Sequence, residues 1–300
     1  MKYIINNNIQ IYRGKGKIII DDFEFFKETK LKFDKKMIEV LLFFKSEKSM
    51  LDFINSFKIK SVNEAEKIIY RLLELNILKI YNNKKCIKNK TILIIGCGAM
   101  GSLLYLSISK SNYIKKIILI DDDIIEKKNL QMQIFTIKNI GKFKVDILEE
   151  LCSNDSKIIK IKTKINSVNE LCKIFKNHAP DISILCADEP DWKTNANIIK
   201  QVSEIFSKPY ILSKGYIGNI TALPEFYYPN DKSEWNIDSG KEELLIKIEN
   251  KIEFHELLPS IFIITKQLEN FFDNKKPIYY KEKGFIDKKT IIIKKYEKNL

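Results

Sequence analysis

The spacing of hydrophobic positions changes within the first 80 residues of the chain. Short β-branched segments separated by Asn and Gly predict strands within residues 2–21. Apolar residues then recur at three- and four-residue intervals, which is typical of amphipathic helices, before a closing strand at residues 77–81. The expected helices span residues 35–44, 50–57 and 64–75. Together these elements predict a small winged-helix-like α+β domain over residues 1–82.

Beyond a polar, basic stretch at residues 81–90, which we expect to be a linker, apolar runs alternate with amphipathic segments. This alternation predicts an α/β domain over residues 90–300, with a doubly wound, mostly parallel, Rossmann-like sheet. The expected strands are 91–96, 115–123, 157–165, 181–188 and 209–217, and the expected helices are 101–111, 141–152, 168–178 and 192–206. The less regular tail contains an expected helix at 259–272 and an end strand at 290–296.

A glycine-rich turn, GCGAMG at residues 96–101, lies between the first strand and the first helix of this second domain. Gly96, Gly98 and Gly101 form the pattern GxGxxG, which lets the backbone approach a phosphate at a helix N-terminus. Asp121 ends the next strand twenty residues after Gly101, where a carboxylate can accept hydrogen bonds from a ribose. The pattern predicts a nucleotide site, and its alternative is a tight turn without a ligand.

Composition and charge limit the partners, the location and the cysteine-based sites that we expect for this chain. The formal net charge of +13 is compatible with a nucleic-acid partner, but the lysines are interleaved with acidic residues and only two arginines occur. We therefore expect no nucleic-acid partner. No uninterrupted apolar run reaches about 18 residues, which predicts no membrane association and a cytoplasmic location. The five cysteines are scattered, so neither a disulfide framework nor a zinc site is expected.

Three further segments follow the glycine turn in a distinctive order. They are DDDIIEKKNLQMQIF, GKFKVDILEEL and ISILCADEPDWKTNAN. With the turn, they resemble the motifs of the ThiF/MoeB/HesA family of ubiquitin-activating-enzyme-like adenylyltransferases over residues 90–230. The resemblance implies ATP and Mg²⁺ as cofactors and a homodimer. An NAD-dependent dehydrogenase shares the glycine fingerprint, but neither His178 nor His255 stands out as an acid or base for hydride transfer.

The resemblance also implies roles for individual residues. The nucleotide-binding residues would be Gly96, Gly98, Gly101, Asp121, Asp123, Asn129 and Lys144, and the catalytic residues would be Asn129, Gln133, Lys144, Asp188 and Lys193. Asp188 would bind Mg²⁺, and the metal and Lys144 would offset the charge that grows at the attacked phosphate. Simpler alternatives are a solvated helix lysine at 144, a helix cap at 188 and a turn residue at 129.

Departures from the family pattern affect the expected rate. Met132 stands where the family has an arginine, and Lys193 stands where a later arginine often follows the metal-binding aspartate. The stretch at residues 81–90 also lacks the family's arginine that reaches the partner subunit. These losses would reduce turnover more than nucleotide binding. No cysteine follows Cys186, so the zinc pairs of many relatives are missing, and transfer through a cysteine thioester is not expected.

The N-terminal module and residues 215–229 are similar to the subgroup of peptide-adenylating enzymes of microcin C biosynthesis. The resemblance implies a precursor peptide as partner, added as an extra strand at a groove formed by residues 17–21 and the helix at 64–75. The expected activity is ATP- and Mg²⁺-dependent adenylation of a carboxyl group of a ribosomally made peptide. The alternative is a catalytically attenuated scaffold that delivers the peptide to a partner modifying enzyme, a YcaO-type cyclodehydratase.

Overall fold

The chain divides into two compact units, Met1–Lys85 and Cys86–Leu300, each with its own hydrophobic core. The computed structural model describes residues 1–81, 89–111, 113–151, 157–189, 191–213, 215–217, 220–231, 253–287, 290 and 292–295. The expected linker at 81–90 and part of the C-terminal tail therefore lie largely outside the described residues. In the described ranges, no helix has the length and apolar character needed to cross a membrane.

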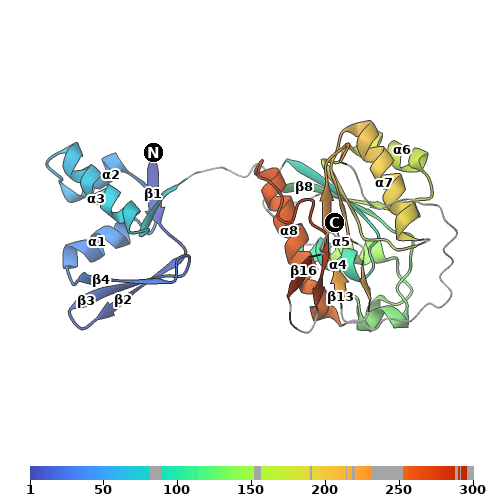
Figure 1. Ribbon diagram of the computed structural model, residues 1–300, viewed down its shortest axis with the longest axis horizontal. Coiled ribbons are helices and arrows are strands. Elements are labelled where there is room, and N and C mark those ends of the chain that lie inside the picture. Colours follow the sequence, from blue (N-terminus) through green and yellow to red (C-terminus); the bar gives the residue numbers. More distant parts are fainter. Residues whose placement is uncertain are drawn as a thin grey trace, which may run out of the picture. The chain divides into compact units, whose positions relative to one another are not determined.

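The N-terminal unit is an α+β domain built around two three-stranded sheets (Figure 1). One sheet has the order β2–β3–β4 and the other β5–β1–β6. The strands are β1 (Lys2–Ile5), β2 (Ile9–Gly14), β3 (Lys17–Asp22), β4 (Lys27–Lys32), β5 (Lys48–Ser49) and β6 (Leu78–Tyr81). The helices are α1 (Lys35–Phe43), α2 (Met50–Phe57) and α3 (Val62–Glu74). Ile18 and Ile20 of β3 are buried in one core with Phe44, Phe53 and Ile69.

Two features of this unit differ from the expectation. Strand β4, with the sequence KETKLK, was not predicted, because its apolar content is limited to Leu31 and its pairing with β3 supplies the order. Strand β3, which contains residues 17–21, is the central strand of its sheet, with β2 and β4 hydrogen-bonded to its two edges. The prediction that a peptide adds to residues 17–21 is therefore wrong, because the free edges belong to β2 and β4.

The larger unit is a doubly wound α/β domain, as predicted. Its six-stranded sheet has the order β14–β11–β10–β7–β8–β9, and all pairs are parallel except β11 with β14. The strands are β7 (Lys90–Ile95), β8 (Ile114–Ile120), β9 (Lys157–Ile161), β10 (Ile182–Leu185), β11 (Tyr210–Leu212) and β14 (Glu225–Tyr227). The chain winds outward from β7 to β9 and then returns to the other side of β7, so the strand order reverses between β7 and β10.

Helices cover both faces of this sheet (Figure 1). The helices α4 (Ala99–Ser109), α5 (Lys144–Leu151) and α8 (Leu258–Phe272) share one core with Ile92 and Ile94 of β7. The helices α6 (Val168–His178) and α7 (Trp192–Phe206) share the other core with Leu93 and Ile95. The alternate residues of β7 thus pack in opposite cores, which explains why residues 92–95 of this strand are all apolar.

The expected strand at 209–217 is in fact two strands that belong to different sheets. The chain leaves the large sheet after β11 and passes Gly215, whose φ of +82° favours glycine. It then enters a four-stranded sheet with the order β12–β13–β15–β16. Its strands are β12 (Tyr216–Ile217), β13 (Ile220–Ala222), β15 (Gly284–Asp287) and β16 (Ile293–Lys295). The glycine lets the backbone change direction there, so a continuous strand does not form.

Asp231 connects the end of this region to the segment after α8. Its carboxylate accepts hydrogen bonds from the Tyr280 hydroxyl at 2.9 and 3.0 Å and from the Tyr228 N–H at 2.8 Å, and Lys281 Nζ lies 3.1 Å away. Burial acts to raise the pKa of Asp231, but these donors outweigh it, and the pKa is lowered overall. The carboxylate form is therefore favoured in the folded state.

We expect Asp231 to stabilise the fold at neutral pH and to stop doing so in acid. The lowered pKa means that the stabilisation is present above the unfolded-state pKa, about 3.9, and is lost as the pH falls through the folded-state value. Asp231→Asn should lower the free energy of unfolding by about 1–2 kcal/mol at pH 7. Urea unfolding followed by circular dichroism should show that the difference in free energy of unfolding between the wild type and the variant becomes smaller at pH 3. A difference that stays the same would contradict this assignment.

Candidate functional site

A cavity of about 590 Å³ lies at the carboxyl ends of the parallel strands. It is lined by residues that follow β7, β8, β9, β10 and β11, and it includes the point between β7 and β10 where the strand order reverses. Open α/β sheets bind ligands at this place, because the flanking loops diverge there and leave a crevice. The volume falls in the range of sites for small molecules and cofactors.

The glycine turn forms the floor of the cavity, and its three glycines have different reasons to be glycine. Gly96 has φ of +89°, and a Cβ there would lie 2.6 Å from the Ala187 backbone nitrogen. A Cβ on Gly101 would lie 1.9 Å from the Gly96 carbonyl oxygen. A Cβ on Gly98, however, would meet only Gln133 Nε2, at 4.0 Å. The fold itself therefore requires Gly96 and Gly101, whereas Gly98 keeps the cavity open above the N-terminus of α4.

Asp121 lies at the end of β8, directly beside this turn. Its carboxylate accepts hydrogen bonds from the Cys97 N–H at 2.6 Å and from the Asp123 N–H at 2.9 Å. Burial raises the pKa of Asp121, although Lys144 and the two N–H donors act in the opposite direction. Its place at the β8 end of the cavity is the one predicted for a ribose-binding carboxylate.

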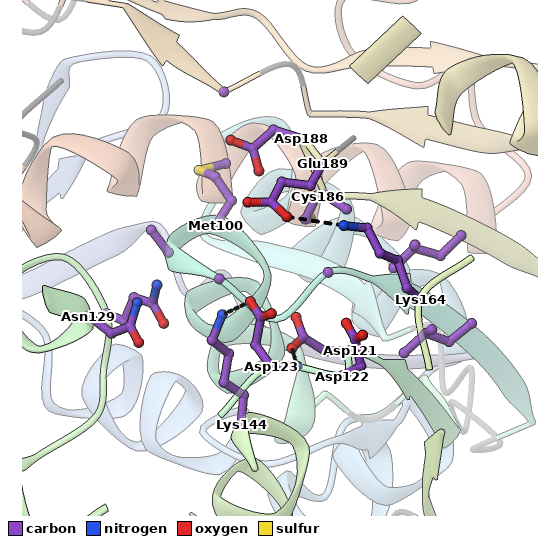
Figure 2. A pocket seen from close by; sticks show the side chains of 18 of the residues that line it. Met100, Asp121, Asp122, Asp123, Asn129, Lys144, Lys164, Cys186, Asp188 and Glu189 are labelled. Atoms are coloured by element: carbon purple, nitrogen blue, oxygen red, sulfur yellow. Dashed lines mark hydrogen bonds and ion pairs between the residues drawn. The ribbon is translucent and has the colours of Figure 1, made fainter. Parts of the chain in front are cut away.

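Lys144 begins α5 and lies in the cavity wall with only 4% of its surface exposed. Its ammonium lies 2.5 Å from Asp123 Oδ2, while the Asp123 side chain is 62% exposed (Figure 2). The Lys144 N–H also donates to the Asp123 carbonyl at 3.0 Å, which fixes the start of the helix. A buried ammonium aimed at an exposed carboxylate is not the solvated helix lysine of the simpler alternative, and it can contribute positive charge to an anionic ligand.

Asn129 and Gln133 enter the cavity from the segment between β8 and α5. Asn129 lies in the short helix η1 (Lys127–Gln131), where its Oδ1 accepts a hydrogen bond from the Glu126 N–H at 2.7 Å. This bond orients the amide and accounts for the local turn. Gln133 differs, because its Oε1 is buried without a hydrogen-bond partner. Such an orphaned polar atom in a cavity wall points to a missing ligand or water.

Asp188 lines the opposite wall, after β10, and its side chain is exposed. Tyr216 lies near it, since the Asp188 charge contributes, after burial, to raising the pKa of the Tyr216 hydroxyl. Asp188 does not cap α7, because Asp191 does so through the Thr194 N–H at 2.9 Å. Lys193 is exposed in the first turn of α7 and is not among the residues that line the cavity. The cavity wall thus contains every predicted site residue except Gly101 and Lys193.

The cavity wall also contains charged residues that the motifs did not single out. Lys128 lies 2.6 Å from Glu126, and Lys164 lies 3.1 Å from Glu189. Six carboxylates and three lysines line the cavity in all, so its wall has an excess of negative charge. An anionic ligand would need a cation to offset this field. Lys164 and Glu189 each follow a parallel strand, and this position is the signal that could have identified them.

The cysteines near the cavity are poorly suited to nucleophilic attack. Cys97 is fully buried. Cys186 was expected within the strand at 181–188, but β10 ends at Leu185, and Cys186 follows it and lines the cavity. Burial raises the pKa of Cys186 to about 12 and raises that of Cys97 well above its ordinary value. Both thiols are therefore protonated at neutral pH, which disfavours thioester chemistry at these positions.

The fold of the whole chain is similar to that of several solved structures. The E. coli protein MccB, crystallised with ATP, shares 19% identity and a TM-score of 0.72, with 99% of this chain and 97% of that chain covered. MccB crystallised with MccA gives 19% identity and a TM-score of 0.70 over the same shares. PaaA gives 15% identity and a TM-score of 0.67, over 97% of this chain and 99% of its own. At these identities the likeness concerns the fold alone.

Comparison with known protein sequences identifies the family to which the chain belongs. "Adenylyltransferase and sulfurtransferase UBA4" of Scheffersomyces stipitis is 32% identical over 133 residues, which are 43% of this chain and 28% of that protein. This chain thus spans little more than a quarter of the length of that relative. The ThiF family matches residues 71–232, more than half of the chain, and the match contains the glycine turn, Asp121, Lys144 and Asp188. The predicted resemblance is confirmed, and the chain belongs to the ThiF family.

Proposed function

We propose that this protein uses ATP and Mg²⁺ to adenylate a carboxyl group of a ribosomally made precursor peptide. The observation that carries the proposal is the convergence of Gly98, Asp121, Lys144 and Asp188 on one cavity at the reversal point of the sheet. A triphosphate over the N-terminus of α4 would face free N–H groups and the Lys144 ammonium. Its ribose would lie at Asp121. The open space above Gly98 and the unpartnered Gln133 Oε1 both fit such a ligand.

The donor set also fits magnesium bound mainly through a substrate. Within the ranges that the structure describes, no group of three His, Cys, Asp or Glu side chains is arranged to hold a metal ion. Mg²⁺ commonly binds through one or two carboxylates and the substrate's phosphates, and the exposed Asp188 in the cavity wall can serve as such a ligand. When bound, the metal would offset the charge between two anions. Lys144 would stabilise the phosphate that is attacked.

The peptide substrate is proposed from two independent supports. The solved relatives include MccB with MccA, and the likeness to MccB extends over 99% of this chain, including the N-terminal unit. One sheet of that unit has β2 and β4 as its edge strands, where an extended peptide could add a strand. Positioning by the N-terminal unit would raise the effective concentration of the peptide's carboxylate.

Peptide-dependent exchange of radiolabelled pyrophosphate into ATP tests this proposal. The wild-type protein with its cognate precursor peptide should catalyse exchange, and Asp188→Asn should reduce the rate by about tenfold to a thousandfold, because the metal ligand is weakened while the side chain keeps its size. Asp191→Asn is the matched control, since Asp191 caps α7 outside the cavity. Absence of exchange by the wild type with its peptide would refute the proposed activity.

One observation favours a second candidate function, a scaffold that presents the peptide to a modifying enzyme. Met132 lines the cavity where the family has an arginine, and its Sδ lies 3.8 Å from the Tyr216 hydroxyl. The thioether therefore takes a place where a cation would otherwise face the phosphates. Calorimetry separates the two candidates, because the enzyme requires Mg-ATP binding, whereas a pure scaffold should bind the peptide equally well with and without nucleotide.

A further inference from the structure

An ion pair joins two loops that come from opposite sides of the cavity. Lys164 follows β9, Glu189 follows β10, and Lys164 Nζ lies 3.1 Å from Glu189 Oε2. In the sheet, β7 and β8 lie between these two strands. Three strand spacings separate β9 from β10, a distance of about 14 Å. The two side chains together therefore span the cavity at the ends of the strands that carry the glycine turn and Asp121.

Figure 2 shows this arrangement from close by. Lys164 extends toward Glu189, and Asp121 and Asp122 lie below the pair in the view. All four residues line the same cavity. Since Asp121 is at the β8 end and Lys164 follows the neighbouring strand β9, the Lys164 end of the pair lies toward the part of the cavity beyond the ribose position. A nucleotide with its ribose at Asp121 would place its base there.

Both ends of the ion pair are attached to rigid structure. Next to Lys164, Ile165 is 6% exposed and belongs to the core beneath β8 and α7. On the other side, the Glu189 carbonyl accepts a hydrogen bond at 2.7 Å from Nδ2 of Asn195, a residue of α7 that is 6% exposed. The backbones at the two ends are thus held in place, so the side chains meet across a fixed distance and less freedom is lost when they pair.

We propose that Lys164 and Glu189 are positioning residues that form a clasp over the base and ribose of the bound nucleotide and slow its release. The inference rests on the proposed nucleotide site. The neighbouring carboxylates raise the pKa of Lys164, Glu189 first, so the ammonium stays charged over the physiological range. Opening the clasp separates an exposed ion pair, and the expected contribution is correspondingly modest.

Charge reversal tests the clasp through the rate of nucleotide release. Each protein is loaded with Mg²⁺ and 2-aminopurine riboside triphosphate, and the fluorescence change on chasing with excess ATP gives the dissociation rate. Lys164→Glu and Glu189→Lys should each raise this rate by about threefold to tenfold, since reversal removes an attraction and adds a repulsion. The double variant, in which the two charges are exchanged, should return the rate to within about twofold of the wild type.

The matched control is Lys162→Glu. Lys162 lies two residues earlier and pairs with Asp146 at 2.7 Å, outside the cavity, so its reversal should leave the release rate unchanged. A faster rate in this control, a double variant as fast as Lys164→Glu alone, or equal rates in all variants would each overturn the clasp. A wild type that binds no nucleotide would overturn the proposed function as well. Nucleotide binding with unchanged release rates would overturn the clasp alone.

Discussion

Replacing Lys144 by methionine is expected to lower peptide-dependent pyrophosphate exchange by about 10²–10³-fold, the usual effect of removing one donor that stabilises charge in a transition state. Methionine keeps the apolar stem in the buried position but removes the ammonium, which lies 2.5 Å from Asp123. The fold should be retained, because Asp123 is 62% exposed and can be solvated when it loses its partner. Initial exchange rates and thermal melting of the same preparations check both statements.

Lys142→Met is the control for this substitution. Lys142 precedes α5 by two residues and is exposed, and its side chain is outside the cavity wall. It should exchange pyrophosphate at the wild-type rate. If the two variants lose activity equally, the effect comes from net charge or from the loop, and Lys144 has no special role. If Lys144→Met retains full activity, the ion pair with Asp123 is only structural.

Alanine substitutions in the glycine turn should separate binding from folding. Gly98→Ala places a methyl group in the open cavity and should weaken Mg-ATP binding by about tenfold to a hundredfold, with little change in melting temperature, if a methyl group in a packed contact costs about 1–3 kcal/mol. Gly101→Ala forces its Cβ to within 1.9 Å of the Gly96 carbonyl oxygen unless the backbone moves. It should therefore lower the melting temperature or prevent folding.

Calorimetric titration with Mg-ATP and differential scanning fluorimetry on both variants give the two readouts. Equal destabilisation by Gly98→Ala and Gly101→Ala would favour the simpler view of the turn, a tight connection between strand and helix without a ligand. Unchanged ATP affinity in Gly98→Ala would show that phosphates do not lie above this residue. The comparison works because the three glycines are glycine for different physical reasons.

The site and the sheet were best predicted where the residue types in a segment and the connectivity of the strands indicate the same structure. The glycine turn and Asp121 could be assigned to one site because parallel strands place the residues that follow them at a common edge, whereas Lys144 was assigned through the resemblance to the family. The alternation of apolar runs was sufficient for the doubly wound sheet and for α6 and α7, whose predicted and observed bounds agree. These features depend on short-range spacing and on a strong rule of connectivity.

Other features depend on contacts between distant segments, which spacing does not reveal. Strand β4 is mostly charged and is ordered by β3, and residues 209–217 form two strands because their pairing partners lie in different sheets. Lys164 and Glu189 are separated by 25 residues, and they meet because both follow strands that end at the same edge of the sheet, where their long side chains reach across the ends of β7 and β8. Lys193 is the opposite case: the motif predicted it as a site residue, but it does not line the cavity.

The small sheet of the larger unit affects the order in which the site can be completed during synthesis. Tyr216 in the cavity wall lies on β12, which pairs with β13, and β13 in turn pairs with β15 at Phe285, Ile286 and Asp287. A chain emerging from the ribosome presents its glycine turn well before β13 and β15 are made. The cavity therefore acquires this part of its wall only after residues 284–287 have been synthesised, and shortened chains that stop before β15 lack that support.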